Sequence, residues 1–96
     1  MENKEKLLKI ISDSNLDLGD KEMWQNFFDS NPEKALEAYV DVFASFPEEL
    51  GWFNEIMKRK IAAMILIQGG DIEGEKKMKE IIEDEKKKLE ELSEKL

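Results

Sequence analysis

The chain has 96 residues, of which 41% are hydrophobic and 40% are charged. A length below about 150 residues is typical of one domain, and this composition supports a core whose exterior is largely charged. Asp and Glu number 23 against 15 Lys and Arg, which gives a formal net charge of -8. Because such a surface repels nucleic acid and anionic membranes, we expect neither as a partner.

The residue types that are missing exclude several kinds of chemistry. The chain contains no Cys, His or Thr, so it lacks disulfides, the usual zinc ligands and the commonest general base. Asp13, Asn15 and Asp17 offer oxygens at alternate positions, as calcium loops do. However, Leu18 and Trp24 stand where such a loop needs glycine and glutamate. We therefore expect no metal, no cofactor and no catalytic activity.

The amino-terminal segment and the longest apolar run bear on localisation. Residues 1–14 alternate acids and bases without the apolar stretch of a signal peptide. The longest apolar run, residues 61–67, has seven residues, whereas a helix that crosses a membrane needs about 20. We expect a cytoplasmic protein.

The spacing of apolar residues predicts five helices, at about 3–12, 21–29, 32–46, 47–68 and 72–95. In the first, Leu7, Leu8 and Ile11 form the stripe of a short amphipathic helix. Turn-forming residues at 13–20 follow, and Asp20 is expected to cap the second helix.

Asn31 and Pro32 predict the start of the third helix, because asparagine caps a free backbone amide and proline is tolerated at the first helical position. Phe46 and Pro47 predict its end. In the fourth helix every side is apolar across residues 61–67, which predicts burial by neighbouring helices at the centre of the core. The alternative for this run is a buried strand.

Gly69 and Gly70 are expected to end the fourth helix, and Asp71 to cap the fifth. The fifth helix has apolar residues at alternating steps of three and four, with Glu85 in one of those steps. The connections between helices are short, and no segment alternates with period two. The sequence therefore predicts an all-α fold: a small bundle of four to five helices arranged as antiparallel helical hairpins, in a single domain over residues 1–96.

The third predicted helix resembles the second helix of a tetratricopeptide repeat. The small, aromatic, small and proline positions of that motif are matched in order by Ala35, Tyr39, Val42 and Pro47. A similar small, bulky and small series occurs 39 residues later, at Gly74, Met78 and Ile81. The resemblance covers about half of the chain, departs from the 34-residue period of the family, and lacks its first-helix signature around 50–57. It implies stacked helical hairpins whose concave side binds peptide segments of other proteins.

Large aromatic side chains are concentrated between residues 24 and 53. A bundle of this size cannot bury all of these rings together with residues 61–67, so Trp24 or Trp52 is expected at a surface patch. The function that we favour is a non-catalytic helical module that binds a protein partner through an apolar and aromatic patch with an acidic rim, which would suit a basic partner. The expected contact residues are Trp24, Phe28 and Trp52, with Glu48 and Glu49 at the rim.

Two alternatives remain open. Residues 13–55 hold eleven acids against two bases, as in an acidic inhibitor or antitoxin-like protein that covers a basic site on its partner. The other alternative is a structural homo-oligomer, such as a homodimer, formed through the fifth helix. The fifth helix is about 36 Å long, so its last turns are expected either to fold against the first helix or to project and pair with a second copy. The expected interface residues are Leu89, Leu92 and Leu96.

Overall fold

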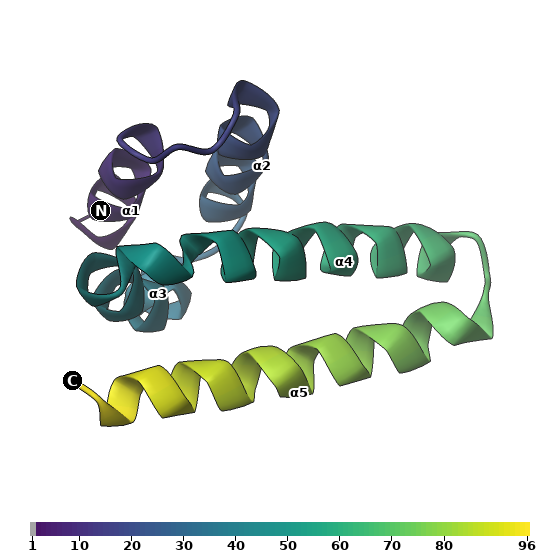
Figure 1. Ribbon diagram of the computed structural model, residues 1–96. Helices are drawn as coiled ribbons and strands as arrows, with labels where there is room; N and C mark the ends of the chain where they lie inside the picture. The colour runs from purple at the N-terminus through teal and green to yellow at the C-terminus, as the bar shows by residue number, and fades with distance from the viewer. Residues whose placement is uncertain (1) are drawn as a thin grey trace. The chain divides into compact units, whose positions relative to one another are not determined.

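The computed structural model describes the backbone of residues 2–96. It contains five α-helices in this range, namely α1 Glu2–Ser12, α2 Leu18–Asp29, α3 Glu33–Ser45, α4 Leu50–Gln68 and α5 Ile72–Glu94, and a short 3-10 helix, Pro47–Glu49 (Figure 1). None of the described residues is in a strand, which confirms the all-α prediction and excludes a strand at 61–67. Residue contacts divide the chain into two compact units, α1 to α3 and α4 with α5, separated after Glu48. The single domain expected from the sequence stays a prediction.

In the first unit, α1 contacts both α2 and α3. Leu7 and Ile11 are buried, as the apolar stripe of the first predicted helix requires. At one end of α1, the Asn3 backbone N–H donates to Glu33 Oε2 and the Asn3 side-chain amide donates to the Glu33 carbonyl, both at 3.0 Å. Lys4 forms an ion pair with Asp29 at the end of α2. These contacts fix the start of α1 against α2 and α3.

Aromatic rings join α2 to α3. The Trp24 ring lies edge-on to Phe43, with ring centroids 5.5 Å apart, and Phe27 lies edge-on to Tyr39 at 5.7 Å. Trp24 also contacts Phe28 within α2, at 5.7 Å. Edge-to-face and tilted arrangements at these distances are favourable for aromatic pairs. The core of this unit is therefore built largely from rings.

The cap of α2 differs from the prediction. Asp17, rather than Asp20, is the N-cap: its carboxylate accepts a hydrogen bond from the Asp20 backbone N–H at 2.8 Å. A cap residue needs a non-helical backbone, and Asp17 has an extended conformation. The helix consequently begins at Leu18, three residues before the predicted start at residue 21.

The role of Asn31 also differs from the prediction. Its side-chain amide donates a hydrogen bond to the Phe27 carbonyl at 2.7 Å, so Asn31 satisfies an acceptor in the last turn of α2. The N-cap of α3 is Pro32, which makes no side-chain hydrogen bond there, and the helix begins at Glu33. The Asn-Pro pair thus marks the correct boundary, but the asparagine completes the preceding helix.

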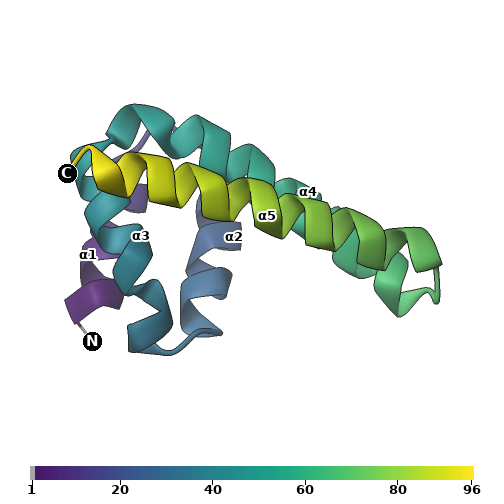
Figure 2. The ribbon, with the colours of Figure 1, turned by 90° about the horizontal axis from the view of Figure 1, so that it is seen from below.

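In the second unit, α4 and α5 run antiparallel and side by side (Figures 1 and 2). The corner between them is a Schellman motif, in which the Gly70 N–H donates to Ile67 O and the Asp71 N–H donates to Leu66 O. Gly70 has a φ of 80°, which favours glycine. Asp71 then caps α5 by accepting a hydrogen bond from the Glu73 N–H at 2.9 Å. Both helix boundaries confirm the prediction for this corner.

Gly74 lets the start of α5 lie against the end of α4. A Cβ atom at this position would lie 2.7 Å from the Ile67 backbone nitrogen, 2.8 Å from Leu66 Cβ and 3.0 Å from the Ala63 carbonyl oxygen. Two of these three neighbours are backbone atoms, which cannot move without shifting a helix. The close approach of the two helices therefore depends on the missing side chain.

We expect Gly74→Ala to destabilise the protein by about 2 kcal/mol, because the steric clash outweighs the gain of about 1 kcal/mol in helix propensity. Gly51, in the first turn of α4, is the matched control, since nothing lies within 4 Å of an added Cβ there. Gly51→Ala should stabilise the protein by about 0.5 kcal/mol. Urea denaturation followed by circular dichroism measures both changes, and equal stabilisation by the two substitutions would contradict the close packing.

The prediction that residues 61–67 form the centre of the core is wrong. Ala63 is buried, but Ile61 is 39% exposed, Met64 51% and Ile65 63%. Within its unit α4 has one neighbour, α5, and a single neighbouring helix covers one stripe of a helix rather than its whole circumference. The buried cluster of the hairpin accordingly contains Ile56, Ala63 and Ile81, flanked by partly buried Trp52 and Met78.

Candidate interaction surface

Exposed and partly buried aliphatic side chains gather on one surface of the hairpin. We call this surface the aliphatic face and define it by six residues of α4 and α5: Ile61, Met64, Ile65, Ile67, Met78 and Ile82. Successive residues of a helix advance by about 100°. On α5, Met78 and Ile82 follow the buried stripe in one rotational sense, and on α4 Met64 follows it in the same sense, which in antiparallel helices leads to the same flank. Ile61 and Ile65 each lie about 160° from buried Ala63, so the face extends beyond this flank over the outer side of α4. The face is therefore continuous across the two helices.

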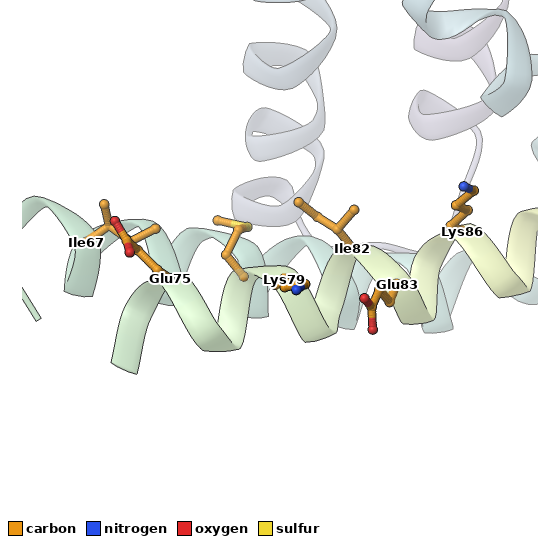
Figure 3. Close-up of a pocket in the computed structure, with 7 residues that line it drawn as sticks. Ile67, Glu75, Lys79, Ile82, Glu83 and Lys86 are labelled. Carbon is orange, nitrogen blue, oxygen red and sulfur yellow. The ribbon is translucent and has the colours of Figure 1, made fainter. Parts of the chain in front are cut away.

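A shallow depression of about 510 Å³ occupies the α5 side of the aliphatic face. Its lining combines aliphatic and charged side chains, namely Ile67, Glu75, Met78, Lys79, Ile82, Glu83 and Lys86. Ile82 and Lys86 point to the same side of α5, whereas Glu83 points to the outer edge (Figure 3). The depression thus has an apolar floor and a rim on which acids and bases alternate along the chain.

A second depression lies on a different part of the hairpin and shares no residue with the first. It has a volume of about 370 Å³ and is lined by Arg59, Ala62, Ala63, Leu66, Lys77, Glu80 and Ile81. None of these aliphatic residues is among the strongly exposed large hydrophobic residues. The aliphatic face is therefore the stronger candidate for a site that another molecule covers.

A buried ion pair fixes α4 against α5 beneath this surface. Lys60 Nζ donates to Glu85 Oε1 at 2.5 Å, and the two side chains are only 16% and 9% exposed. Glu85 occupies the step in the apolar pattern of the fifth predicted helix that lacked a hydrophobic residue. Because a buried charge without its partner is strongly unfavourable, the pair favours a register in which Lys60 and Glu85 meet. That register sets which residues of α4 and α5 meet at the aliphatic face.

Two residues that the sequence assigned to partner contact lie in the interior of the first unit. Trp24 and Phe28 have no exposed surface, because their rings pack against each other and Trp24 packs against Phe43 of α3. The prediction that Trp24 and Phe28 form a surface patch is therefore wrong. The rings of α2 and α3 fill the space between these helices. A chain of this length can therefore bury more of its aromatic rings than the sequence analysis expected.

The other predicted contact residues lie near the start of α4. Trp52 is partly buried, and Lys88 Nζ lies 5.4 Å from the centroid of its ring. Lys88 also forms an ion pair with Glu49 at 3.1 Å, while Glu48 is exposed. Trp52 and Glu49 thus contact α5 of their own hairpin, and neither belongs to the aliphatic face. Because Trp24 and Phe28 have no exposed surface, they cannot form an exposed patch with these residues.

The three leucines predicted as an oligomer interface have different environments. Leu92 is 2% exposed, Leu89 is partly buried and Leu96 is 60% exposed. Of the two alternatives for the last turns, projection of all three leucines is contradicted, because Leu92 continues the buried stripe of α5 that contains Ile81 and Glu85. Only Leu96 presents a large apolar surface to solvent.

Sequence reasoning missed the residues of the aliphatic face because it assigned them to the core. The available signal was the apolar run itself, which exceeds what one neighbouring helix can cover.

Within residues 2–96, no helix is long and apolar enough to cross a membrane. The described side chains include no group of three or more Asp or Glu arranged to hold a metal ion. Comparisons with protein families, curated proteins and solved structures found no significant match to this chain.

Proposed function

We propose that this chain is a non-catalytic, cytoplasmic helical module that binds a protein partner through the aliphatic face. The observation that carries the proposal is the exposure of Ile61, Met64, Ile65 and Ile82 on one surface of a hairpin, each at least 39% exposed. Single exposed apolar residues are ordinary at a protein surface, but a contiguous group with a polar rim is typical of an interaction site. The shallow depression beside Ile82 gives a protruding side chain of the partner a place to bind.

The charges around this face indicate which surface charges a partner would carry. Glu75, Lys79, Glu83 and Lys86 line the depression with two acids and two bases. A partner that complements this rim carries both signs of charge, rather than the basic surface that an entirely acidic rim would select. The aliphatic face replaces the aromatic patch as the proposed contact. The tetratricopeptide resemblance and the acidic-inhibitor alternative stay predictions.

We expect Ile82→Asp to abolish binding while leaving the fold intact. A carboxylate buried against an apolar partner is strongly unfavourable, so partner affinity should fall at least tenfold, which corresponds to about 1.4 kcal/mol. The free energy of unfolding should change by less than about 0.5 kcal/mol, since Ile82 is already half exposed. Affinity capture from the cells that produce the protein, followed by titration of the captured partner, measures the effect.

Leu18→Asp is the matched control for this experiment. Leu18 is 84% exposed, and it lies at the start of α2, outside the aliphatic face. The substitution introduces the same side chain at an exposed aliphatic position, so partner capture should be retained. Equal capture by the Ile82→Asp variant and the unchanged chain would overturn the proposal.

A further inference from the structure

We propose that the aliphatic face binds a second copy of this chain, docked antiparallel so that α5 lies on α5 around one twofold axis. This inference rests on the proposed function and names its partner. It differs from the leucine interface expected from the sequence, because it uses the first two thirds of α5 rather than its last turns. Three features of the hairpin support it.

The first feature is the order of charges along α5. From the start of the helix, the rim of the depression contains Glu75, Lys79, Glu83 and Lys86. Antiparallel packing reverses this order in the second copy and brings the same flank of both helices together. Glu75 then lies opposite Lys86 of the second copy, and Lys79 lies opposite Glu83 of the second copy. Twofold symmetry repeats each pair, so two kinds of pair give four contacts between opposite charges.

The second feature is that the apolar residues of α5 obey the same symmetry. The charge pairs of α5 place the twofold axis near Ile81, with Met78 and Ile82 on either side of it. Ile82 of one copy therefore lies close to Ile82 of the second copy, across the axis.

The third feature is that a parallel arrangement fails. If the two α5 helices ran in the same direction around a twofold axis, every residue would lie level with its own copy. Glu75 would then approach Glu75 of the second copy, and Lys79 would approach Lys79, which is unfavourable for like charges at an interface. A foreign apolar helix requires only the hydrophobic residues of the face. The palindromic order of acids and bases is what favours a second copy.

The test uses the full chain and two variants with opposite charge. Lys79→Glu with Lys86→Glu makes the rim entirely acidic, and Glu75→Lys with Glu83→Lys makes it entirely basic. Sedimentation equilibrium of the pure chain should give a mass that rises with concentration toward twice the 11.2 kDa of one chain. Each charge variant alone should remain at the mass of one chain. An equimolar mixture of the two should recover the doubled mass as a one-to-one heterodimer.

A control separates this effect from a general change in charge. Lys76→Glu with Lys87→Glu changes the net charge by the same amount on the same helix, at exposed positions outside the depression. This variant should associate with itself as the unchanged chain does. Circular dichroism of all the variants should show the same helix content, which establishes that a monomer is a folded monomer.

The outcomes distinguish the inference from the proposed function. Heterodimer formation in the mixture supports a second copy as the partner. A pure chain that stays at the mass of one chain up to millimolar concentration overturns the inference, as does a mixture that stays monomeric. In another outcome, the chain is monomeric and captures a different protein. If the Ile82→Asp variant fails to capture that protein, the proposed function stands without the inference. If the chain is monomeric and the Ile82→Asp variant captures the same proteins as the unchanged chain, both the inference and the proposed function are overturned. A cross-link from position 82 to α1, α2 or α3 of the same monomeric chain equally overturns the second copy.

Discussion

Replacing Trp24 with alanine should lower the free energy of unfolding by about 3–5 kcal/mol, the usual cost of deleting a large aromatic side chain from a core. Trp24 has no exposed surface, and its ring contacts Phe27, Phe28 and Phe43. Its removal therefore deletes apolar burial and three ring contacts at once. Small domains are stable by about 5–15 kcal/mol, so the loss is a large part of the total.

Thermal and urea unfolding followed by far-ultraviolet circular dichroism measure this effect. Leu18→Ala is a suitable control, because it truncates an aliphatic side chain that is 84% exposed on the same helix. It should change the stability by less than about 0.5 kcal/mol. A cost below about 1 kcal/mol for Trp24→Ala would mean that the ring does not hold α2 and α3 together. Trp24→Phe should lower the free energy of unfolding by less than Trp24→Ala and by more than Leu18→Ala, since it keeps an aromatic ring but leaves a cavity.

The buried ion pair should show a large difference between single and double replacement. Glu85→Leu removes the carboxylate that Lys60 contacts while the ammonium group remains largely buried, which should cost about 3–5 kcal/mol. Lys60→Met combined with Glu85→Leu removes both charges and keeps a similar volume, so its stability should be close to that of the unchanged chain or higher. The double variant should therefore be more stable than either single variant.

The control for this comparison is the exposed pair Lys95 and Glu91, whose nitrogen and oxygen atoms are 3.8 Å apart and whose side chains are both 60% exposed. Glu91→Leu should change the stability by no more than about 0.5 kcal/mol, because solvent screens exposed ion pairs. Urea denaturation of the single and double variants gives the coupling energy between Lys60 and Glu85. A coupling near zero would show that the pair does not set the register of the hairpin.

The sequence predicts the helices of this fold well, because amphipathic spacing and helix-end residues act over a few positions. The corner at Gly70 and Asp71 is correct for this reason: a positive φ and a capping carboxylate are local requirements. The caps at Asp20 and Asn31 were wrong since several neighbouring polar residues can satisfy the same backbone groups. Which of them does so depends on where the backbone turns, and Asp17 and Pro32 hold the extended conformations.

The interaction surface was less predictable than the helices, because burial depends on which elements become neighbours. An apolar run such as residues 61–67 has the same sequence pattern whether it lies within a bundle or in a two-helix hairpin. The same ambiguity made Trp24 a surface candidate, although rings from α2 and α3 enclose it. Glu85 was recognised as a gap in the apolar stripe, but its contact with Lys60 joins residues 25 positions apart. Helical periodicity carries no information about such pairs.

The pattern of contacts between helices has a consequence for how the chain folds. In each unit, the helices in contact are consecutive or separated by one helix: α1 with α2 and α3, α2 with α3, and α4 with α5. Only short loops have to close before such contacts form, so we expect a low entropic barrier and rapid folding. Domains form progressively during synthesis from the amino terminus. The unit of α1 to α3 can thus assemble while the ribosome is still producing α4 and α5, which carry the aliphatic face.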